Sequence, residues 1–214
     1  MRFLLLSLLF SSFAFAGNPI VVMDTTMGSI EIELNEEKAP VTVKNFLAYV
    51  DSKFYDKTIF HRVINGFMVQ GGGFEEGLKE KKTRAPIINE GKNGLRNDEG
   101  TIAMARTGDP NSATAQFFIN VNNNDSLNYP QPDGHGYAVF GRVTKGMHVV
   151  NRMKMVKTGT LGGYENVPMD TVMIKSVRRL EAAPAAAAPT EAKVEATPAP
   201  APKKSSKKKS SKKK

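Results

Sequence analysis

FHRVINGFMVQGGGF, residues 60–74, joins two strand-like runs through an Asn-Gly turn. Alternate side chains of a strand face the same way, so Met68 and Gln70 are expected on one face and Phe67 on the other. An arginine, two large apolar side chains and a glutamine therefore fall within nine residues of chain. Two interpretations stay open at this point. Either Arg62 is a surface charge beside core residues, or these side chains line a site.

Outward from this stretch, the chain consists of many short strands and few helices. Apolar residues recur at helical spacing after Pro40, which predicts an amphipathic helix over residues 41–51, and a second short helix fits residues 147–153. Turn-forming residues separate the strand-like runs, which are Ile20–Met23, Ile30–Leu34, Thr58–Val63, Phe67–Gln70, Thr101–Ala105, Gln116–Val121, Tyr137–Val143 and Val172–Val177. Because a sheet that closes on itself has no exposed edge, we expect a mainly β fold, a small antiparallel barrel with two covering helices.

Composition predicts one folded domain over residues 17–180, between two segments of a different kind. Residues 1–16 combine one positive charge, an apolar run and small residues near their end, which predicts a secretory signal cleaved before Gly17. Residues 181–214 are rich in Ala, Pro and Lys and contain almost no large apolar side chain. Such a composition cannot offset the entropy of ordering, so we expect this segment to be a disordered tail.

The net charge of +9 resides mainly in the tail. Nine lysines against three glutamates give residues 181–214 a charge of +6, and residues 17–180 carry only +2. A nucleic-acid surface is expected to interleave basic and aromatic residues on the domain itself, and this pattern is missing. Nucleic acid is therefore an unlikely partner, although a tail that binds nucleic acid remains an alternative.

Several common catalytic constellations are missing from the sequence. The three histidines, His61, His135 and His148, have no metal-ligand spacing, and there is no cysteine. Neither a G-x-S-x-G elbow nor an H-E-x-x-H helix occurs, and the triple glycine of residues 71–73 lacks the Lys-Ser/Thr of a phosphate loop. We therefore predict a site without a metal ion or a cofactor.

The motifs in their order and spacing resemble the cyclophilin family. Beside residues 60–74, the resemblance rests on the motifs GTIAMAR (residues 100–106), SATAQFFIN (residues 112–120) and GYAVFG (residues 136–141). It covers nearly all of residues 18–179, and the first motif alone is highly specific. The resemblance implies a closed eight-stranded antiparallel barrel capped by two helices, and it implies cis-trans isomerisation of the peptide bond before proline.

The resemblance also implies the roles of particular residues. Catalysis falls on Arg62, Phe67 and Gln70, and substrate binding on Met68, Ala105, Arg106, Gln116, Phe118, Leu127 and Tyr137. Ser126 stands where animal cytosolic cyclophilins have tryptophan, and Tyr137 stands where they have histidine. A serine lacks the apolar area and the reach of an indole donor, so we predict weak binding of cyclosporin.

The physics of the reaction agrees with an arginine at this position. Resonance in the X-Pro bond creates a barrier of about 18–20 kcal/mol, and twisting the bond returns a lone pair to the prolyl nitrogen. The permanently charged guanidinium of Arg62 can hydrogen-bond that nitrogen more strongly in the twisted state, which lowers the barrier. The alternative is a proline-peptide binding chaperone with the same pocket and little catalysis.

Partners and localisation follow from the signal and the tail. We expect a bacterial secreted protein, periplasmic, that acts on proline-containing unfolded or flexible polypeptides. The clustered lysines of residues 203–214 are expected to tether it to anionic envelope lipids or polymers, since each lysine near such a surface contributes about 1 kcal/mol. The alternative is a solubilising end without a specific target.

Overall fold

The computed structural model describes residues 17–180. The predicted signal (residues 1–16) and the predicted tail (residues 181–214) lie outside the described residues. Within the described part, no helix has both the length and the apolar character needed to cross a bilayer.

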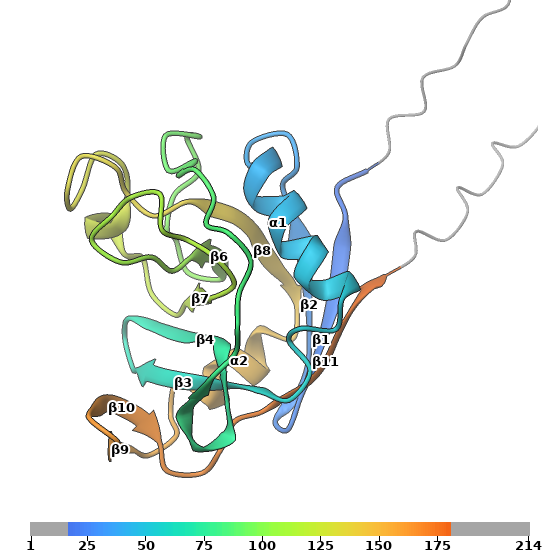
Figure 1. Ribbon diagram of the computed structural model, residues 1–214, viewed down its shortest axis with the longest axis vertical. Helices are drawn as coiled ribbons and strands as arrows, with labels where there is room; N and C mark the ends of the chain where they lie inside the picture. Colours follow the sequence, from blue (N-terminus) through green and yellow to red (C-terminus); the bar gives the residue numbers. More distant parts are fainter. Residues whose placement is uncertain (1–16, 181–214) are drawn as a thin grey trace, which may run out of the picture. The chain divides into compact units, whose positions relative to one another are not determined.

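A single antiparallel sheet dominates the fold, with eight strands in the order β11-β1-β2-β8-β6-β7-β4-β3 (Figure 1). A short ninth strand, β5, pairs with β4, and β9 and β10 form a separate hairpin beside β3. The strands are β1 Ile20–Thr25, β2 Gly28–Leu34, β3 Thr58–Ile64, β4 Met68–Glu75, β5 Lys79–Glu80, β6 Thr101–Met104, β7 Phe117–Asn120, β8 Val139–Lys145, β9 Thr158–Leu161, β10 Tyr164–Pro168 and β11 Ile174–Leu180. The prediction of a mainly β fold is confirmed.

The sheet curls into a half-barrel, and the predicted closed barrel is not confirmed. Within residues 17–180, the end strand β3 meets the segment that leads into the other end strand, β11, through one isolated bridge, between Ile59 and Met173. On either side of the bridge, the N–H of Lys57 donates to the carbonyl of Ile174 at 2.8 Å and the N–H of Phe60 to that of Val172 at 2.9 Å, but no continuous ladder follows. The pairing of β3 with β4 slips twice, between Thr58 and Phe60 and again before Arg62. Such bulges bend a strand and interrupt pairing, which explains the open seam.

Both predicted helices are present, α1 at Pro40–Asp51 and α2 at Met147–Met153. Helix α1 buries the predicted apolar face, and its Phe46 packs against Tyr55, Phe117 and Phe140 with ring centroids 5.1–5.8 Å apart. No side chain of its own N-cap residue caps the helix. Instead the carboxylate of Glu90, from a distant loop, accepts the N–H groups of two residues in the first turn. The packing of Phe46 against Phe117 fixes β7, one of the strands that carry the site.

Two short 3-10 helices complete the fold, η1 at Glu76–Leu78 and η2 at Asp125–Leu127. The sequence did not predict either of them, because single turns have no periodicity to detect. Helix η2 lies in the segment between β7 and β8 and brings Leu127 to the site described below.

Candidate active site

A small cavity of about 110 Å³ opens on the face of the sheet formed by β3, β4, β6 and β7, and we call it the inner cavity. Its lining residues come from six separate stretches of chain: Arg62, Phe67, Met68, Gln70, Ala105, Arg106, Phe118, Leu127 and Tyr137. The tenth residue predicted for the site, Gln116, hydrogen-bonds Gln70. The structure therefore brings together all ten residues that the sequence singled out.

Strand pairing explains most of this convergence. Gln70 of β4 lies opposite Phe118 of β7 on one side and opposite Arg62 of β3 on the other. Met68 and Phe118 are buried, and they pack with Ala103 and Val139 into a small apolar cluster beneath the cavity. A rigid apolar floor of this kind suits a compact apolar ring.

Phe67 departs from the alternation that the sequence suggested. It lines the same cavity as Met68 and Gln70, although a continuous strand would turn it to the other face. The reason is that β4 begins only at Met68, so Phe67 belongs to the β3–β4 turn and is not subject to strand geometry. The carbonyl of Phe67 accepts hydrogen bonds from the N–H of Val121 and from the amide of Asn124, which fix the turn.

Three polar side chains form a chain along one wall of the cavity. Nη1 of Arg62 donates to Oε1 of Gln70 at 3.3 Å, and Nε2 of Gln70 donates to Oε1 of Gln116 at 3.0 Å. Arg62 forms no ion pair with any residue between 17 and 180. Most donors of this half-buried guanidinium are therefore available to a bound molecule.

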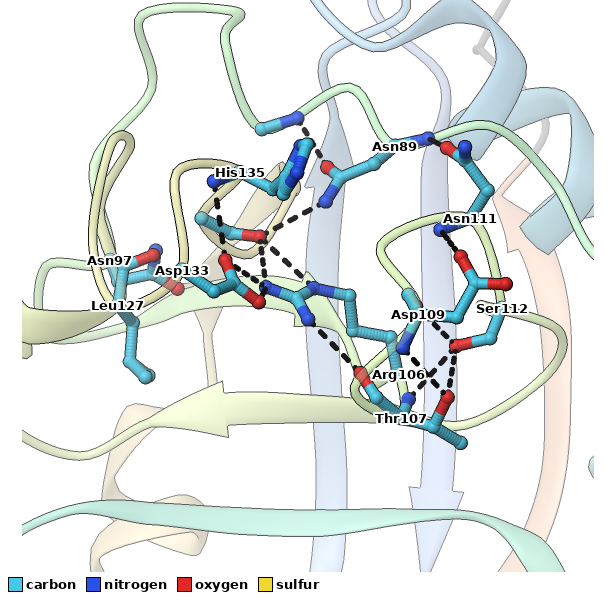
Figure 2. A network of polar contacts seen from close by, with 12 residues as sticks. Asn89, Asn97, Arg106, Thr107, Asp109, Asn111, Ser112, Leu127, Asp133 and His135 are labelled. Carbon is cyan, nitrogen blue, oxygen red and sulfur yellow. Dashed lines mark hydrogen bonds and ion pairs between the residues drawn. The ribbon is translucent and has the colours of Figure 1, made fainter.

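Arg106, by contrast, uses its side chain within the protein (Figure 2). Its guanidinium donates to the carbonyls of Thr107 and Gly136 at 3.0–3.2 Å and to the carboxylate of Asp133 at 2.8–2.9 Å. It also lies 4.4 Å above the ring of Tyr137, and only 3% of the side chain is exposed. The substrate contact predicted for Arg106 stays a prediction, and the side chain leaves it to the backbone.

The sequence did not predict the residues that hold this part of the site. Asp133 and Gly136 bind Arg106 from the loop of residues 128–136, and the amide of Asn89 donates to the same Gly136 carbonyl at 3.0 Å. The amide of Asn97 reaches the carbonyl of Leu127 at 3.2 Å. The Pro-Asp-Gly run at residues 132–134 signals a turn, but no sequence pattern pairs Asp133 with an arginine 27 residues away.

His61 lies next to Arg62 but turns away from solvent. The residue is 4% exposed, and its ring contacts the ring of Phe74 at 4.6 Å between centroids. Burial, with the neighbouring charge of Arg62 as the smaller cause, lowers the pKa of His61 from 6.5 to about 4. The imidazole is therefore neutral near pH 7.

The other predicted features of the site have clear positions. The ring of Tyr137 stands edge-on to Phe118 at 5.8 Å, where the resemblance placed it. Ser126 is exposed and does not line the inner cavity, whereas its neighbour Leu127 does. Within the described residues, no three His, Cys, Asp or Glu side chains cluster so as to hold a metal ion.

Comparison with known proteins identifies this arrangement. The family model described as "Cyclophilin type peptidyl-prolyl cis-trans isomerase/CLD" matches residues 20–179, which contain the whole cavity. The chain belongs to the cyclophilin-type peptidyl-prolyl cis-trans isomerase family. The motifs that resemble this family contribute most of the residues that line the inner cavity.

Bacterial cyclophilins resemble the chain over nearly their whole length. Peptidyl-prolyl cis-trans isomerase cyp18 of Streptomyces antibioticus is 58% identical over 75% of this chain and 98% of its own. Peptidyl-prolyl cis-trans isomerase B of Escherichia coli is 56% identical over 74% of this chain and 98% of its own. A crystal structure of a Cryptosporidium parvum cyclophilin superimposes with a TM-score of 0.64 at 28% identity, covering 78% of this chain and 99% of that one.

The pairing of Arg106 with Asp133 leads to a prediction about this cyclophilin. We expect Asp133→Asn to raise KM for a short proline peptide about two- to fivefold with little change in kcat, because the loop that holds Tyr137 and Leu127 loses one charged contact. Salt screens a partly exposed ion pair, so the KM of the natural protein should rise with salt more than that of the variant. Steady-state kinetics at low and high salt measure both effects.

Asp109→Asn is the matched control for this prediction. Asp109 lies in the neighbouring loop and accepts the N–H of Asn111 at 2.9 Å without contacting Arg106. Its substitution should leave KM unchanged. A KM for Asp133→Asn equal to that of the natural protein at both salt concentrations would show that Asp133 does not position the cavity.

Proposed function

We propose that the inner cavity holds the proline ring of a flexible polypeptide while Arg62 stabilises the twisted X-Pro bond during its isomerisation. One observation supports this most directly. A guanidinium with unused donors lies at the wall of a cavity whose floor, Met68 and Phe118, is buried and apolar. Such a cavity favours the ring of proline over a charged side chain, and it places the ring beside a donor.

The polar chain of Arg62, Gln70 and Gln116 orients the guanidinium for the reaction. Gln70 holds Arg62 from one side and is itself held by Gln116, so the guanidinium keeps its orientation while the bond rotates. With the ring fixed on Met68 and Phe118, rotation is confined to the bond that precedes it. The donor contributes most when the prolyl nitrogen recovers its lone pair, which is the condition for lowering a barrier rather than only binding the substrate.

A protease-coupled isomerisation assay on a proline tetrapeptide tests this function. The expected result is catalysis that saturates with substrate and disappears in Phe118→Ala, which removes part of the apolar floor. Suppression of aggregation by a protein that does not accelerate isomerisation would support the alternative, a proline-peptide binding chaperone. A second crystal structure of the Cryptosporidium parvum cyclophilin was determined in the presence of the dipeptide Ala-Pro. This similarity favours a proline-containing ligand here as well.

We further propose that the substrates are exported proteins in the bacterial periplasm. The support is the signal-like composition of residues 1–16, with one positive charge followed by an apolar run. Amino-terminal sequencing of the protein recovered from a cell-envelope fraction tests the proposal. A mature protein that begins at Gly17 agrees with it, and an unprocessed protein found only with the cytosol contradicts it.

The lysines of residues 203–214 are proposed to bind anionic lipids or polymers of the envelope. Their charge supports this, since attraction to an anionic surface grows with each lysine and weakens with salt. Vesicle co-sedimentation of the protein with and without residues 181–214 tests the proposal. Equal binding by the two forms contradicts it.

Weak inhibition by cyclosporin stays a prediction that rests on Ser126.

A further inference from the structure

A second and larger cavity adjoins the inner cavity, and we call it the outer cavity. It has a volume of about 520 Å³ and shares Arg62, Gln70 and Arg106 with the inner cavity. Its far wall is the end of the β9–β10 hairpin, residues 163–166. Figure 1 shows this hairpin beside β3, the strand that carries Arg62 and pairs with the strand of Gln70. A chain bound in the inner cavity therefore has a second space within reach.

Aromatic rings form one side of the outer cavity. The ring of Tyr164 stands edge-on to Phe74 with centroids 5.4 Å apart, and Phe74 contacts His61 at 4.6 Å. Phe74 and His61 are buried, whereas 44% of Tyr164 is exposed. The neutral imidazole and the two other rings thus make a continuous wall that ends in the half-exposed ring of Tyr164.

The charges around the outer cavity disfavour a charged occupant. Arg62 faces the cavity without a carboxylate partner among the described residues, and it repels a cationic side chain. Glu165 lines the cavity from the hairpin and repels an anionic one. Arg106 is already paired with Asp133. A neutral aromatic side chain avoids both repulsions, packs against the aromatic wall and can lie against the guanidinium of Arg62.

We propose that the outer cavity is a second substrate subsite, which binds an aromatic side chain of the polypeptide whose proline occupies the inner cavity. The proposal rests on the function proposed above and adds a sequence preference to it. Because the two cavities share three residues and consecutive Cα atoms are about 3.8 Å apart, the aromatic residue lies within two positions of the proline. Tyr164 is then a specificity-determining residue and takes no part in bond rotation.

A set of peptides that differ at one position tests the proposal. Ala, Phe, Lys and Glu are placed in turn at each of the two residues before the proline and at each of the two residues after it. We expect the Phe peptide to exceed the Ala peptide in kcat/KM by about two- to tenfold at one of these positions, the range that an aromatic contact supplies. Lys and Glu should not exceed Ala there. Equal kcat/KM values for Phe and Ala at all four positions overturn the proposal.

Variants of the β9–β10 hairpin show whether Tyr164 causes the preference for phenylalanine. Tyr164→Ser should bring the Phe:Ala ratio close to one, and Tyr164→Phe should preserve it. Leu161→Ser is the matched control, because Leu161 lies opposite Tyr164 in the hairpin, is 55% exposed and does not line the cavity. It should keep the ratio of the natural protein. A ratio unchanged in Tyr164→Ser, or lost equally in Leu161→Ser, overturns the assignment to Tyr164.

If no peptide is isomerised by the natural protein, the proposed function itself fails, which is a different result from equal turnover of all peptides.

Discussion

Replacing Arg62 by alanine should lower kcat/KM for a proline peptide by about 10²- to 10³-fold, the range found when one preorganised transition-state donor is removed. The side chain is half-buried and makes one hydrogen bond, to Gln70, so its loss should leave the folded structure intact. Isomerisation kinetics measured beside a thermal melt separate the two effects. A folded variant with unchanged turnover would remove Arg62 from the mechanism.

Arg62→Lys distinguishes charge from geometry in the same assay. Lysine keeps the positive charge but replaces the planar fork by a compact ammonium group on a flexible stem. Because Gln70 orients the guanidinium through Nη1, we expect the lysine variant to be closer to Arg62→Ala than to the natural protein. Activity near that of the natural protein would show that charge alone is sufficient.

As the pH falls, the loss of stability through His61 should begin at a higher pH than the protonation of most carboxylates. In the unfolded chain the pKa of this imidazole is near 6.5, and burial lowers it to about 4 in the folded state. Between these values the unfolded state binds more protons, so the free energy of unfolding is highest above pH 6.5 and falls as the pH drops. The free energy of unfolding falls by on the order of 3 kcal/mol once the imidazole is protonated in both the folded and the unfolded state.

His61→Gln isolates this contribution because glutamine does not titrate. We expect denaturant unfolding of the natural protein to shift to lower denaturant between pH 7 and pH 4.5, and that of the variant to shift much less. The carboxylates of Glu33 and Asp51, whose pKa values are lowered by hydrogen bonds from Asn18 and Arg142 and from Arg179, respond at lower pH. Parallel shifts in the two proteins would assign the acid sensitivity to other groups.

The sequence predicted more of the site than of the barrel. Strand alternation and the turn after Ile64 are local properties, so the two strands of residues 60–74 and the shared face of Met68 and Gln70 could be predicted from this segment alone. Alternation misplaced Phe67, and the site residues outside this segment came from the resemblance to the cyclophilins. Both helices were predictable from local pattern as well, since their apolar residues recur with the helical period. The bulges of β3 have no such signature. The predicted closed barrel is therefore not confirmed, although the strands were largely placed correctly.

Contacts between distant segments were the other feature that the sequence did not predict. Glu90 caps a helix that begins 50 residues earlier, and Asp133 pairs with an arginine of another loop. Neither acidic residue lies near its partner in the sequence, so propensity and periodicity carry no information about the pairing. The same holds for the outer cavity, because the ring of Tyr164 meets Phe74 only after the hairpin has packed beside β3.

Beyond the contacts of Ile59 and Phe60 with residues 172–173, the open seam leaves the rest of β3, including Arg62, at a margin of the sheet, a place where another polypeptide could add itself as a further strand. The bulge before Arg62 works against such growth, since a kinked margin offers no regular row of donors and acceptors to an incoming chain. The β9–β10 hairpin packs beside the same strand. An irregular margin of this kind, partly covered by the hairpin, therefore discourages the addition of a further strand at β3.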